Sequence, residues 1–523
     1  MEAESRADLG KAQGWRGVVP YVVVIAAGCW LAAPHLSDEV WYDEAYTLEH
    51  FATGTPGHAF TRYTKPNNHV LFSAALSLWR SMGTSPATLR ALPLLLFLAT
   101  LGVLVAATGR LAGPSVGVLA GVMFATAHVT QNFAVQLRGY GPSWLPVAVG
   151  LLALPRFLES GSRWWGGLYV AGASIGIGLV PTSLTVFAVF AVWATAVTPL
   201  PWRRFVGRLA VVWLAPLAGL LWYVAVWQTV LQKSQEQWTA QTWPNVFGHW
   251  LWATLIDFWW LAPLLLLGFI GLARQALRAR ERGPASPRGH VFLVSACVIE
   301  APLAYAFLPQ TPFPRTLVPL LPLWYVVLAV LIMAGWRRVF RNKRRVSRVA
   351  MAALIVGMFA LAGLRETGGT GYASRNPPGS KPQDLYDQYY HRDFHPARAV
   401  ALAAEFAART GGVILTDNSD LWALRYAVLG LGPPGPRLPF FHYRKRVLKW
   451  HRAELLESRD ILIVTRSAKR AADILAHFRL AGRGEPRPYA RTGFLKLYLS
   501  PRPGADGEAA DAAKESENGG PRP

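Results

Sequence analysis

The chain has 523 residues, 52% of them hydrophobic, and its mean hydropathy is +0.24. Apolar runs of about 16–22 residues recur along it, which is the length that a helix needs to cross a hydrocarbon layer about 30 Å thick. This composition predicts a polytopic membrane protein and excludes a soluble globular one. The two cysteines, Cys29 and Cys297, both lie in apolar runs, so they predict neither a disulfide framework nor a thiolate metal site.

The net charge of +23 does not indicate nucleic-acid binding, because most basic residues lie in short loops between apolar runs. Such loops are typical of the cytoplasmic side of a membrane protein. Residues 1–16 carry Arg6, Lys11 and Arg16 and lack a small-residue cleavage site, so we interpret them as a cytoplasmic N-terminus before a retained anchor. The basic loops contain Arg203, Arg204 and Arg208; Arg274, Arg278, Arg280 and Arg282; and the run from Arg337 to Arg348 with Lys343.

The membrane region, residues 17–364, is predicted to be all-helical, with about 11–13 transmembrane helices. Residues 165–198 are too many for one straight crossing and form either one kinked helix or two shorter ones. We interpret them as one unit, because counting them once places all the Arg-rich loops on one side. The outer loop 37–68, the loop 228–249 and everything after 365 then face outward, whereas the loop after the fourth span faces the cytoplasm. The predicted spans are 17–36, 69–83, 91–108, 115–131, 143–158, 165–198, 209–227, 250–272, 290–308, 316–335 and 349–364.

The composition changes after Leu364. Residues 365–384 are rich in Gly, Ser and Pro and indicate a linker. Residues 385–500 have the pattern of a small soluble α/β domain, and the tail 501–523 is predicted to be disordered. No Gly-rich phosphate fingerprint accompanies the strands, so we assign this domain no cofactor. Its predicted elements are a helix over 395–409, strands over 413–416, 460–465 and 495–499, and a helix over 471–478.

An acidic cluster follows the first predicted span. Only ten acidic residues lie between Gly17 and Leu364, and five of them fall within the window Ser37–Glu49. Carboxylates are costly near a bilayer and like charges repel, so this clustering favours a functional site. Within it, Asp43 and Glu44 are suited either to capping a surface helix or to acting on an acceptor hydroxyl, one as general base and the other orienting it or holding a cation.

A second candidate motif closes the outer loop, where the chain enters the second predicted span. Lys65 supplies charge, Asn68 and its neighbour supply amide donors, and His69 follows them directly. Together they are suited to holding a phosphate. Each residue taken singly is also typical of an interfacial anchor or a helix cap.

Other polar residues carry weaker signals. Arg138 and Tyr140, between the fourth and fifth spans, are by themselves typical of a loop arginine beside the aromatic belt. Arg315 has the pattern of an ordinary interfacial arginine. Asp257 and Glu300 fall within apolar spans, where either could be the buried partner of an arginine.

Several of these motifs, in this order, resemble those of the GT-C superfamily of membrane glycosyltransferases, within it the protein O-mannosyltransferase and aminoarabinose transferase branch. The likeness covers about the first two thirds of the chain, and the ordered set is more specific than any one motif. The matching segments are WYDEAYT at 41–47, KPNNHVLF at 65–72, LRALPL at 89–94, QLRGY at 136–140 and FPRTLVPLLP at 313–322.

The resemblance implies transfer of a sugar from a polyprenyl-phosphate carrier on the outer face of a cell membrane. It implies Asp43 as general base with Glu44 beside it, Lys65 and His69 facing the donor phosphate or a metal, and Arg138 in the same pocket. The branch often has His-Pro-Pro where this chain has Asn-Asn-His-Val. Some relatives have a carboxylate directly before Lys-Pro, where this chain has Thr64. Whether a divalent cation is needed as a cofactor is therefore left open.

We therefore expect an inverting, multi-pass membrane glycosyltransferase that uses a lipid-linked hexose, such as a mannose-like sugar, or a pentose. Its acceptor would be a glycan, a lipid or a protein outside the cytoplasm, where the C-terminal domain would also lie. The main alternative is a transporter or flippase of lipid-linked sugar precursors, and a second one is a non-enzymatic assembly scaffold that uses the outer domain. Against the transporter, the chain shows few intramembrane charges and no paired inverted halves.

Overall fold

The computed structural model divides into two units, which are described separately: Met1–Ser37 with His50–Tyr390, and Asp38–Glu49 with His391–Pro523. The residues that the structure describes are 18–38, 40–63, 68–198, 205–234, 243–279, 283–306, 314–341, 343–367, 396–410, 413–416, 440–442, 460–465, 471–472, 486–492 and 495–500.

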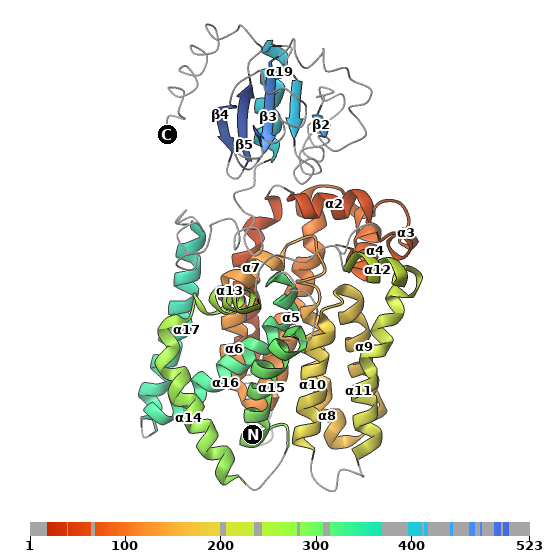
Figure 1. The fold of residues 1–523 in the computed structure, drawn as a ribbon. Helices are drawn as coiled ribbons and strands as arrows, with labels where there is room; N and C mark the ends of the chain where they lie inside the picture. The colour runs from red at the N-terminus through yellow and green to blue at the C-terminus, as the bar shows by residue number, and fades with distance from the viewer. Residues whose placement is uncertain are drawn as a thin grey trace, which may run out of the picture. The chain divides into compact units, whose positions relative to one another are not determined.

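The first unit is entirely helical in its described part (Figure 1). It starts with the helix Val18–Ser37, which ends in the 3-10 turn η1 (Ala33–Ser37). The α-helices that follow are α3 (Gly57–Thr61), α4 (Val70–Trp79), α5 (Pro86–Ala112), α6 (Pro114–Thr126), α7 (His128–Ala134), α8 (Trp144–Ser160), α9 (Arg163–Leu179), α10 (Ser183–Val197), α11 (Val206–Leu220), α12 (Trp227–Ser234), α13 (Trp243–Leu255), α14 (Ala262–Arg278), α15 (Pro287–Ala306), α16 (Leu321–Val339) and α17 (Arg344–Thr367). Short 3-10 turns are η2 (Arg80–Met82), η4 (Leu221–Val226), η5 (Trp259–Leu261) and η6 (Pro314–Leu320).

Within the described residues, six helices are long and apolar enough to cross a membrane. They are Val18–Ser37, Pro86–Ala112, Val206–Gln232, Trp259–Arg278, Arg315–Val339 and Arg345–Leu364. The protein is therefore a multi-pass membrane protein, as the composition predicts. The start of α5 illustrates how such a helix is delimited: Ser85 accepts a hydrogen bond from the Thr88 amide at 3.2 Å, and Gly113, with φ +105°, ends the helix.

The sequence-based division of two predicted spans is wrong. Residues 165–198 do not form one kinked unit but two helices, α9 and α10, separated at Pro181, where proline lacks an amide proton. The predicted span 69–83 contains the ten-residue helix α4, which is only about 15 Å long and too short to cross a bilayer. Its side chains Val70, Phe72 and Leu76 are buried and the helix packs against α9, whereas Leu78 is 63% exposed.

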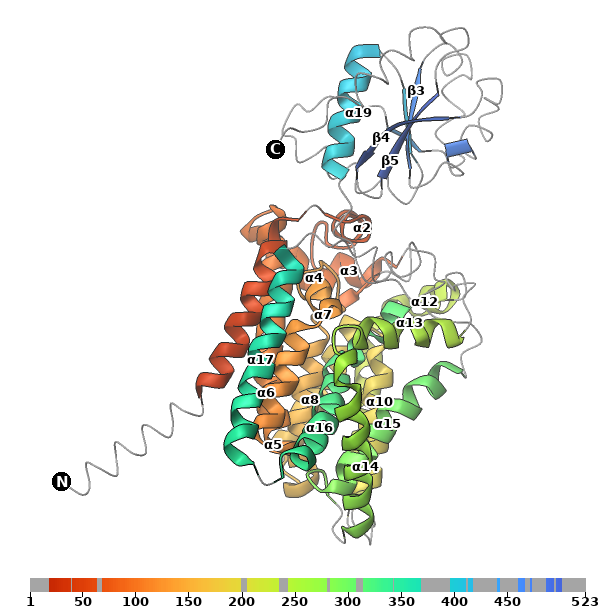
Figure 2. The same cartoon turned by 90° about the vertical axis from the view of Figure 1, so that its left-hand side faces the viewer.

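The centre of the first unit is occupied by α16, as the two views in Figures 1 and 2 show. In the most apolar stretch of the helix Arg315–Val339, which includes α16, 94% of the residues are buried within the protein. Helix α16 therefore contacts other helices on almost all sides. A ring cluster packs beside it, in which Phe124 lies 5.0 Å from Trp144 and 6.0 Å from Tyr325 between ring centroids. On α16, a Cβ at Gly335 would overlap the backbone of α14, so this glycine permits close helix packing.

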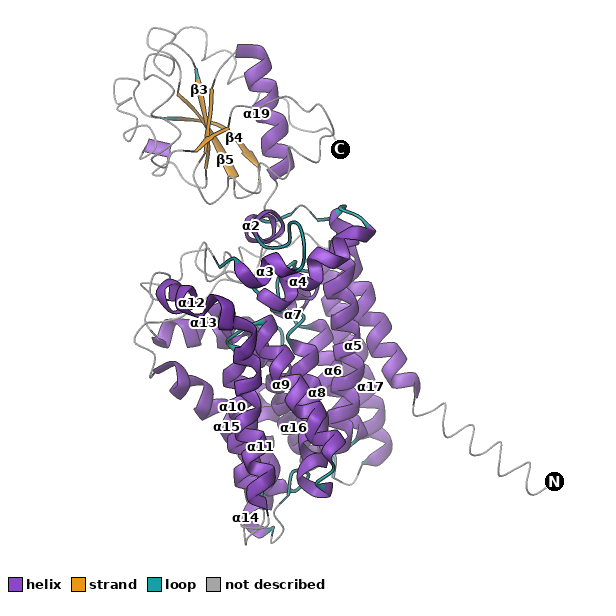
Figure 3. Cartoon of the chain, turned by 90° about the vertical axis from the view of Figure 1, so that its right-hand side faces the viewer, coloured by secondary structure: helices purple, strands orange, loops and turns teal. Residues whose placement is uncertain are grey.

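The second unit contains a five-stranded sheet (Figure 3). Its strands are β1 (Val413–Thr416), β2 (Phe440–His442), β3 (Ile461–Thr465), β4 (Arg487–Thr492) and β5 (Leu495–Ser500), arranged in the order β2-β1-β3-β5-β4. The β1 strand pairs in parallel with β2 and β3, whereas β5 is antiparallel to β3 and β4. The helix α19 (Pro396–Thr410) packs on the sheet.

The predicted α/β character of the C-terminal domain is confirmed, and the expected helix at 395–409 and three expected strands correspond to α19, β1, β3 and β5. The sequence interpretation missed β2 and β4. The expected helix at 471–478 lies mostly outside the described residues. The second unit also includes most of α2 (Tyr42–His50), which carries three of the five acidic residues of the window.

Candidate functional site

His69 lies at the start of α4 and makes two hydrogen bonds that fix its imidazole ring. The Nδ1 atom is 3.0 Å from the backbone carbonyl of Leu179, and the Nε2 atom is 3.0 Å from Nη2 of Arg138. A guanidinium can only donate, so Nε2 must accept, and Nδ1 must carry the proton that is donated to Leu179. The geometry therefore defines His69 as a neutral imidazole with a single tautomer.

Arg138 comes from the turn between α7 and α8, and its side chain is only 2% exposed. The guanidinium carbon lies 5.5 Å from the ring centroid of Tyr140, and that ring meets His69 edge-on at 4.7 Å. Three of the residues predicted for phosphate binding, His69, Arg138 and Tyr140, are thus in mutual contact. A buried guanidinium with this surrounding is suited to an anionic ligand, which offsets the cost of burying a cation.

The position of Arg138 corrects the predicted topology, which places its loop on the side opposite the acidic window. The contact with His69 places the loop instead at the end of the helical bundle where the outer loop returns. The reason is that α4 does not cross the bundle, so every later helix up to α9 runs in the reverse of the predicted direction.

Gly139 allows the loop to approach α4 and α9 this closely. A Cβ at this position would overlap the carbonyl of Leu179 and come within 2.9 Å of Nδ1 of His69. No side chain, even a methyl group, fits between the loop and the other two segments.

The end of α9 supplies the third side of the cluster. The last four carbonyls of a helix lack intrahelical partners, and here each of them lies within hydrogen-bond distance of a donor, although two share one hydroxyl. Val180 donates to the first of them, Gly176, at 3.0 Å. The hydroxyl of Tyr223 lies 3.3 and 3.1 Å from the next two, and His69 takes the carbonyl of Leu179. The side chain of His69 therefore acts as a cap on α9 as well as a partner of Arg138.

Tyr63 lies next to this cluster, with its ring 6.4 Å from that of Tyr223 in an edge-on arrangement. Burial, and to a smaller extent the neighbouring Tyr140, raises the pKa of Tyr63 well above its ordinary value. The phenol is therefore neutral and remains a hydrogen-bond donor throughout the physiological pH range.

The side chain of Asn68 is hydrogen-bonded to other parts of the chain and is not directed to a phosphate by its amide donors. Its Nδ2 atom donates to the carbonyls of Ala59 and Arg62 at 2.9 and 2.8 Å, and its Oδ1 atom accepts from Ser73 at 2.9 Å. Both amide protons are used within the chain, so a donor role toward a phosphate is not supported. The side chain instead connects α3 to α4.

Lys65, the other residue predicted to bind the phosphate, lies outside the described residues. The described part of the chain contains no group of three or more His, Cys, Asp or Glu side chains that could hold a metal ion.

The acidic pair lies in the first turn of α2, where both side chains are buried. Glu44 Oε2 accepts the backbone amide of Trp41 at 2.9 Å, so this carboxylate caps the helix. Asp43 participates in this turn through its carbonyl, which accepts the hydroxyl of Thr47 at 2.9 Å. The capping interpretation thus holds for Glu44, and the role of the Asp43 carboxylate stays a prediction.

Of the two acids that the sequence places within apolar spans, the structure describes the side chain of Asp257. The Oδ2 atom of Asp257 accepts the backbone amide of His128 at 2.7 Å, and its pairing with an arginine stays a prediction. The side chain of Glu300 lies outside what the structure describes.

Sequence reasoning missed the Leu179 carbonyl, Gly139 and Tyr223. A backbone carbonyl has no residue signature, and only the break at Pro181 signals that a helix ends there. Gly139 is part of the QLRGY motif, so its position carried a signal, but the close approach that requires a glycine is visible only in three dimensions.

Comparison with solved structures decides the fold. No protein-family model matches the sequence, and no curated protein matches it significantly. The crystal structure of ArnT from Cupriavidus metallidurans in the apo state matches with a TM-score of 0.53 and 15% identity, covering 94% of this chain and 98% of that one.

The chain has the ArnT fold. The same protein bound to undecaprenyl phosphate matches with a TM-score of 0.51, again at 15% identity and with 94% and 98% of the two chains covered. Both matches extend over the C-terminal α/β domain as well as the helical unit, since so little of either chain is left out. The GT-C fold expected from the motifs is thereby confirmed, whereas the particular branch is not.

Proposed function

We propose that this protein is a membrane glycosyltransferase that transfers a sugar from a polyprenyl-phosphate carrier to an acceptor outside the cytoplasm. The observation that carries the proposal is the buried contact of Arg138 with His69 and Tyr140 at one end of a bundle with the ArnT fold. That a solved neighbour binds undecaprenyl phosphate supports the choice of carrier.

Arg138 is the proposed ligand of the carrier phosphate. Its positive charge would stabilise the phosphate that leaves when the glycosidic bond breaks, and burial strengthens this interaction by excluding water. His69 orients the guanidinium without adding charge, because its imidazole is neutral. Lys65 remains a proposed second cation on sequence grounds, and Tyr140 is proposed as the aromatic surface on which Arg138 rests.

Asp43 is the proposed general base. A phosphate is a good leaving group, so the main chemical requirement is removal of the proton from the acceptor hydroxyl as it attacks the anomeric carbon. Attack from the face opposite the phosphate would invert the configuration. The capping role of Glu44 favours Asp43 for this step, because one carboxylate of the pair is already used to hold α2 in shape.

The decisive experiment compares three purified proteins in transfer from radiolabelled polyprenyl-phosphate hexoses and pentoses to a membrane extract. The wild type should transfer label from at least one donor, and Asp43→Asn should lose turnover while retaining donor binding. Glu44→Gln should keep most activity, because the glutamine Oε1 atom can still accept the Trp41 amide.

Two outcomes would contradict the proposal. Equal activity in Asp43→Asn and the wild type would exclude Asp43 as the base. Absence of transfer from every donor, together with movement of the lipid-linked sugar across vesicles, would show that the protein is a transporter or flippase.

A further inference from the structure

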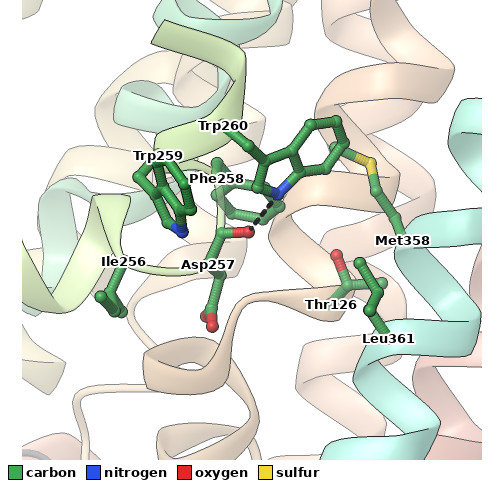
Figure 4. A pocket seen from close by; sticks show the side chains of 8 residues that line it. All are labelled: Thr126, Ile256, Asp257, Phe258, Trp259, Trp260, Met358 and Leu361. Atoms are coloured by element: carbon green, nitrogen blue, oxygen red, sulfur yellow. Dashed lines mark hydrogen bonds between the residues drawn. The ribbon is translucent and has the colours of Figure 1, made fainter. Parts of the chain in front are cut away.

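A pocket of about 340 Å³ lies beside the segment that joins α13 to α14, some distance along the chain from the Arg138 cluster (Figure 4). Among the described residues that line it, Asp257 alone is acidic or basic; the others are Thr126, Ile256, Phe258, Trp259, Trp260, Met358 and Leu361. In Figure 4 the backbone carbonyl of Asp257 accepts the Trp260 indole, at 3.1 Å, while the carboxylate points away from that ring.

The carboxylate is directed at the start of α7. Oδ2 of Asp257 accepts the amide of His128, the first residue of this helix, at 2.7 Å. The first amides of a helix have no intrahelical partner, and a negative charge there also interacts favourably with the helix dipole. The preceding residue, Ala127, is extended with φ −66° and ψ 130°, so α6 ends before it and α7 is a separate element that needs its own anchor.

The other end of α7 leads directly into the loop that carries Arg138. Seven residues of helix extend over about 10 Å, so α7 is a short rigid link between Asp257 and this loop. The ring of Phe133, near the end of α7, lies 5.6 Å from that of Tyr140. A Cβ at Gly141 would overlap the Phe133 carbonyl, which shows how closely the loop folds back on the helix.

We infer that Asp257 is a positioning residue for the phosphate site: by holding the amide of His128, it fixes α7 and thereby the location of Arg138 and Tyr140. This assignment rests on the proposed function, since it describes how the carrier-binding loop is kept in place. In this assignment Asp257 acts through the helix, by its hydrogen bond to the amide of His128.

The test isolates the single backbone hydrogen bond. Proline is well tolerated at the first position of a helix and has no amide proton, and the extended conformation of Ala127 suits a following proline. His128→Pro and His128→Ala both lose the imidazole, but only the proline variant loses the donor. The two are compared in proteins with Asp257 and with Asp257→Ala, by the KM for the carrier, kcat and the midpoint of thermal unfolding.

With Asp257 present, the proline variant should have a carrier KM about tenfold above that of the alanine variant, because loss of the bond displaces Arg138. In the Asp257→Ala background the two should be alike. Asp257→Asn should recover most of the wild-type KM, since its Oδ1 atom can accept the same amide. Met358→Leu, which alters the pocket lining without touching α7, is the matched control and should leave KM unchanged.

Equal KM values for the two His128 variants beside Asp257 would overturn the inference, as would a difference that persists in Asp257→Ala. If the wild type transfers no sugar, the proposed function fails. The midpoints of unfolding then still test whether the hydrogen bond from the His128 amide to Asp257 holds α7 in place. A midpoint difference between the His128 variants that requires Asp257 would support it, and equal midpoints would refute it.

Discussion

Arg138 donates from Nη2 to Nε2 of His69 across 3.0 Å, although 69 positions separate the two residues in the sequence. His69 lies at the start of α4, and Arg138 belongs to the turn before α8. The bond therefore connects these two segments at the point where the end of α9, at Leu179, contacts His69. The bond sets both the tautomer of the histidine and the direction of the guanidinium. Substitutions of His69 and of Arg138 should therefore have effects that can be distinguished from each other.

Replacing Arg138 by alanine should reduce kcat/KM for the carrier about 10- to 100-fold, because a charge-assisted hydrogen bond to the phosphate is lost. Steady-state kinetics with a polyprenyl-phosphate sugar checks this. Arg156→Ala is the matched control: its guanidinium lies 4.2 Å from the ring of Trp165, and the variant should keep wild-type kinetics. A similar loss in both variants would mean that Arg138 has no specific role.

The two hydrogen bonds of His69 can be separated with two amides. Glutamine at this position can place its amide oxygen near the Nε2 site and keep the contact with Arg138, whereas asparagine can only reach the Nδ1 site and keep the contact with Leu179. We expect His69→Gln to retain more activity than His69→Asn, while both remain folded. Transfer rates together with gel-filtration profiles in detergent check this, and the opposite order of activity would show that capping of α9 matters more than orientation of Arg138.

Gly139→Ala should be more damaging than the size of a methyl group suggests. The added carbon would overlap the Leu179 carbonyl, and a rigid backbone on both sides leaves no flexible group to move. We expect a loss of about 1–3 kcal/mol in stability and a strong loss of carrier binding. Unfolding midpoints and carrier binding measure the two effects, and Gly167→Ala, at a position where a Cβ meets nothing within 4 Å, is the control.

Asn68→Ala should lower stability without changing the chemistry. It leaves the carbonyls of Ala59 and Arg62 and the hydroxyl of Ser73 without their partner, which costs about 1–3 kcal/mol for each buried group that water cannot reach. The unfolding midpoint should fall, while the carrier KM of the folded fraction stays the same. A raised KM at an unchanged midpoint would restore the sequence-based hypothesis that Asn68 binds the phosphate.

The fold class could be predicted from the sequence because hydrophobic length is a direct physical requirement of the bilayer. Its details could not, since apolar residues are equally suited to lipid and to a protein interior. The run 69–83 is apolar although α4 is too short to cross a membrane, and one face of this helix, with Phe72 and Leu76, is buried against protein. The composition of 165–198 likewise does not say whether a proline bends a helix or ends it.

These two errors compensate. Counting α4 as a crossing reverses the direction of the following helices, and counting α9 and α10 as one unit reverses it again. The Arg-rich loops therefore fall on a common side in both descriptions, and the charge pattern could not reveal the mistakes. The loops between the two errors are all placed on the wrong side by the sequence, and the one that carries Arg138 is the one that matters for the candidate site.

The candidate site was partly predictable. His69, Arg138 and Tyr140 were selected for their chemistry, and the structure brings them together. Asn68 was selected on the same grounds, but an asparagine at a helix start serves the backbone as readily as a ligand. A pattern of residue types cannot decide between these uses, because the decision depends on which carbonyls the tertiary fold leaves nearby.

The shortness of α4 has a consequence for experiments with compartment-sensitive fusions. The chain returns through α4 without changing sides, so a phosphatase or fluorescent reporter inserted in the turn near Gly54 and one inserted near Gly83 should give the same signal. A reporter at Gly113, after α5, should give the opposite one. Hydropathy alone would assign the first two positions to different compartments, and the protein would then appear to have two orientations when it has one.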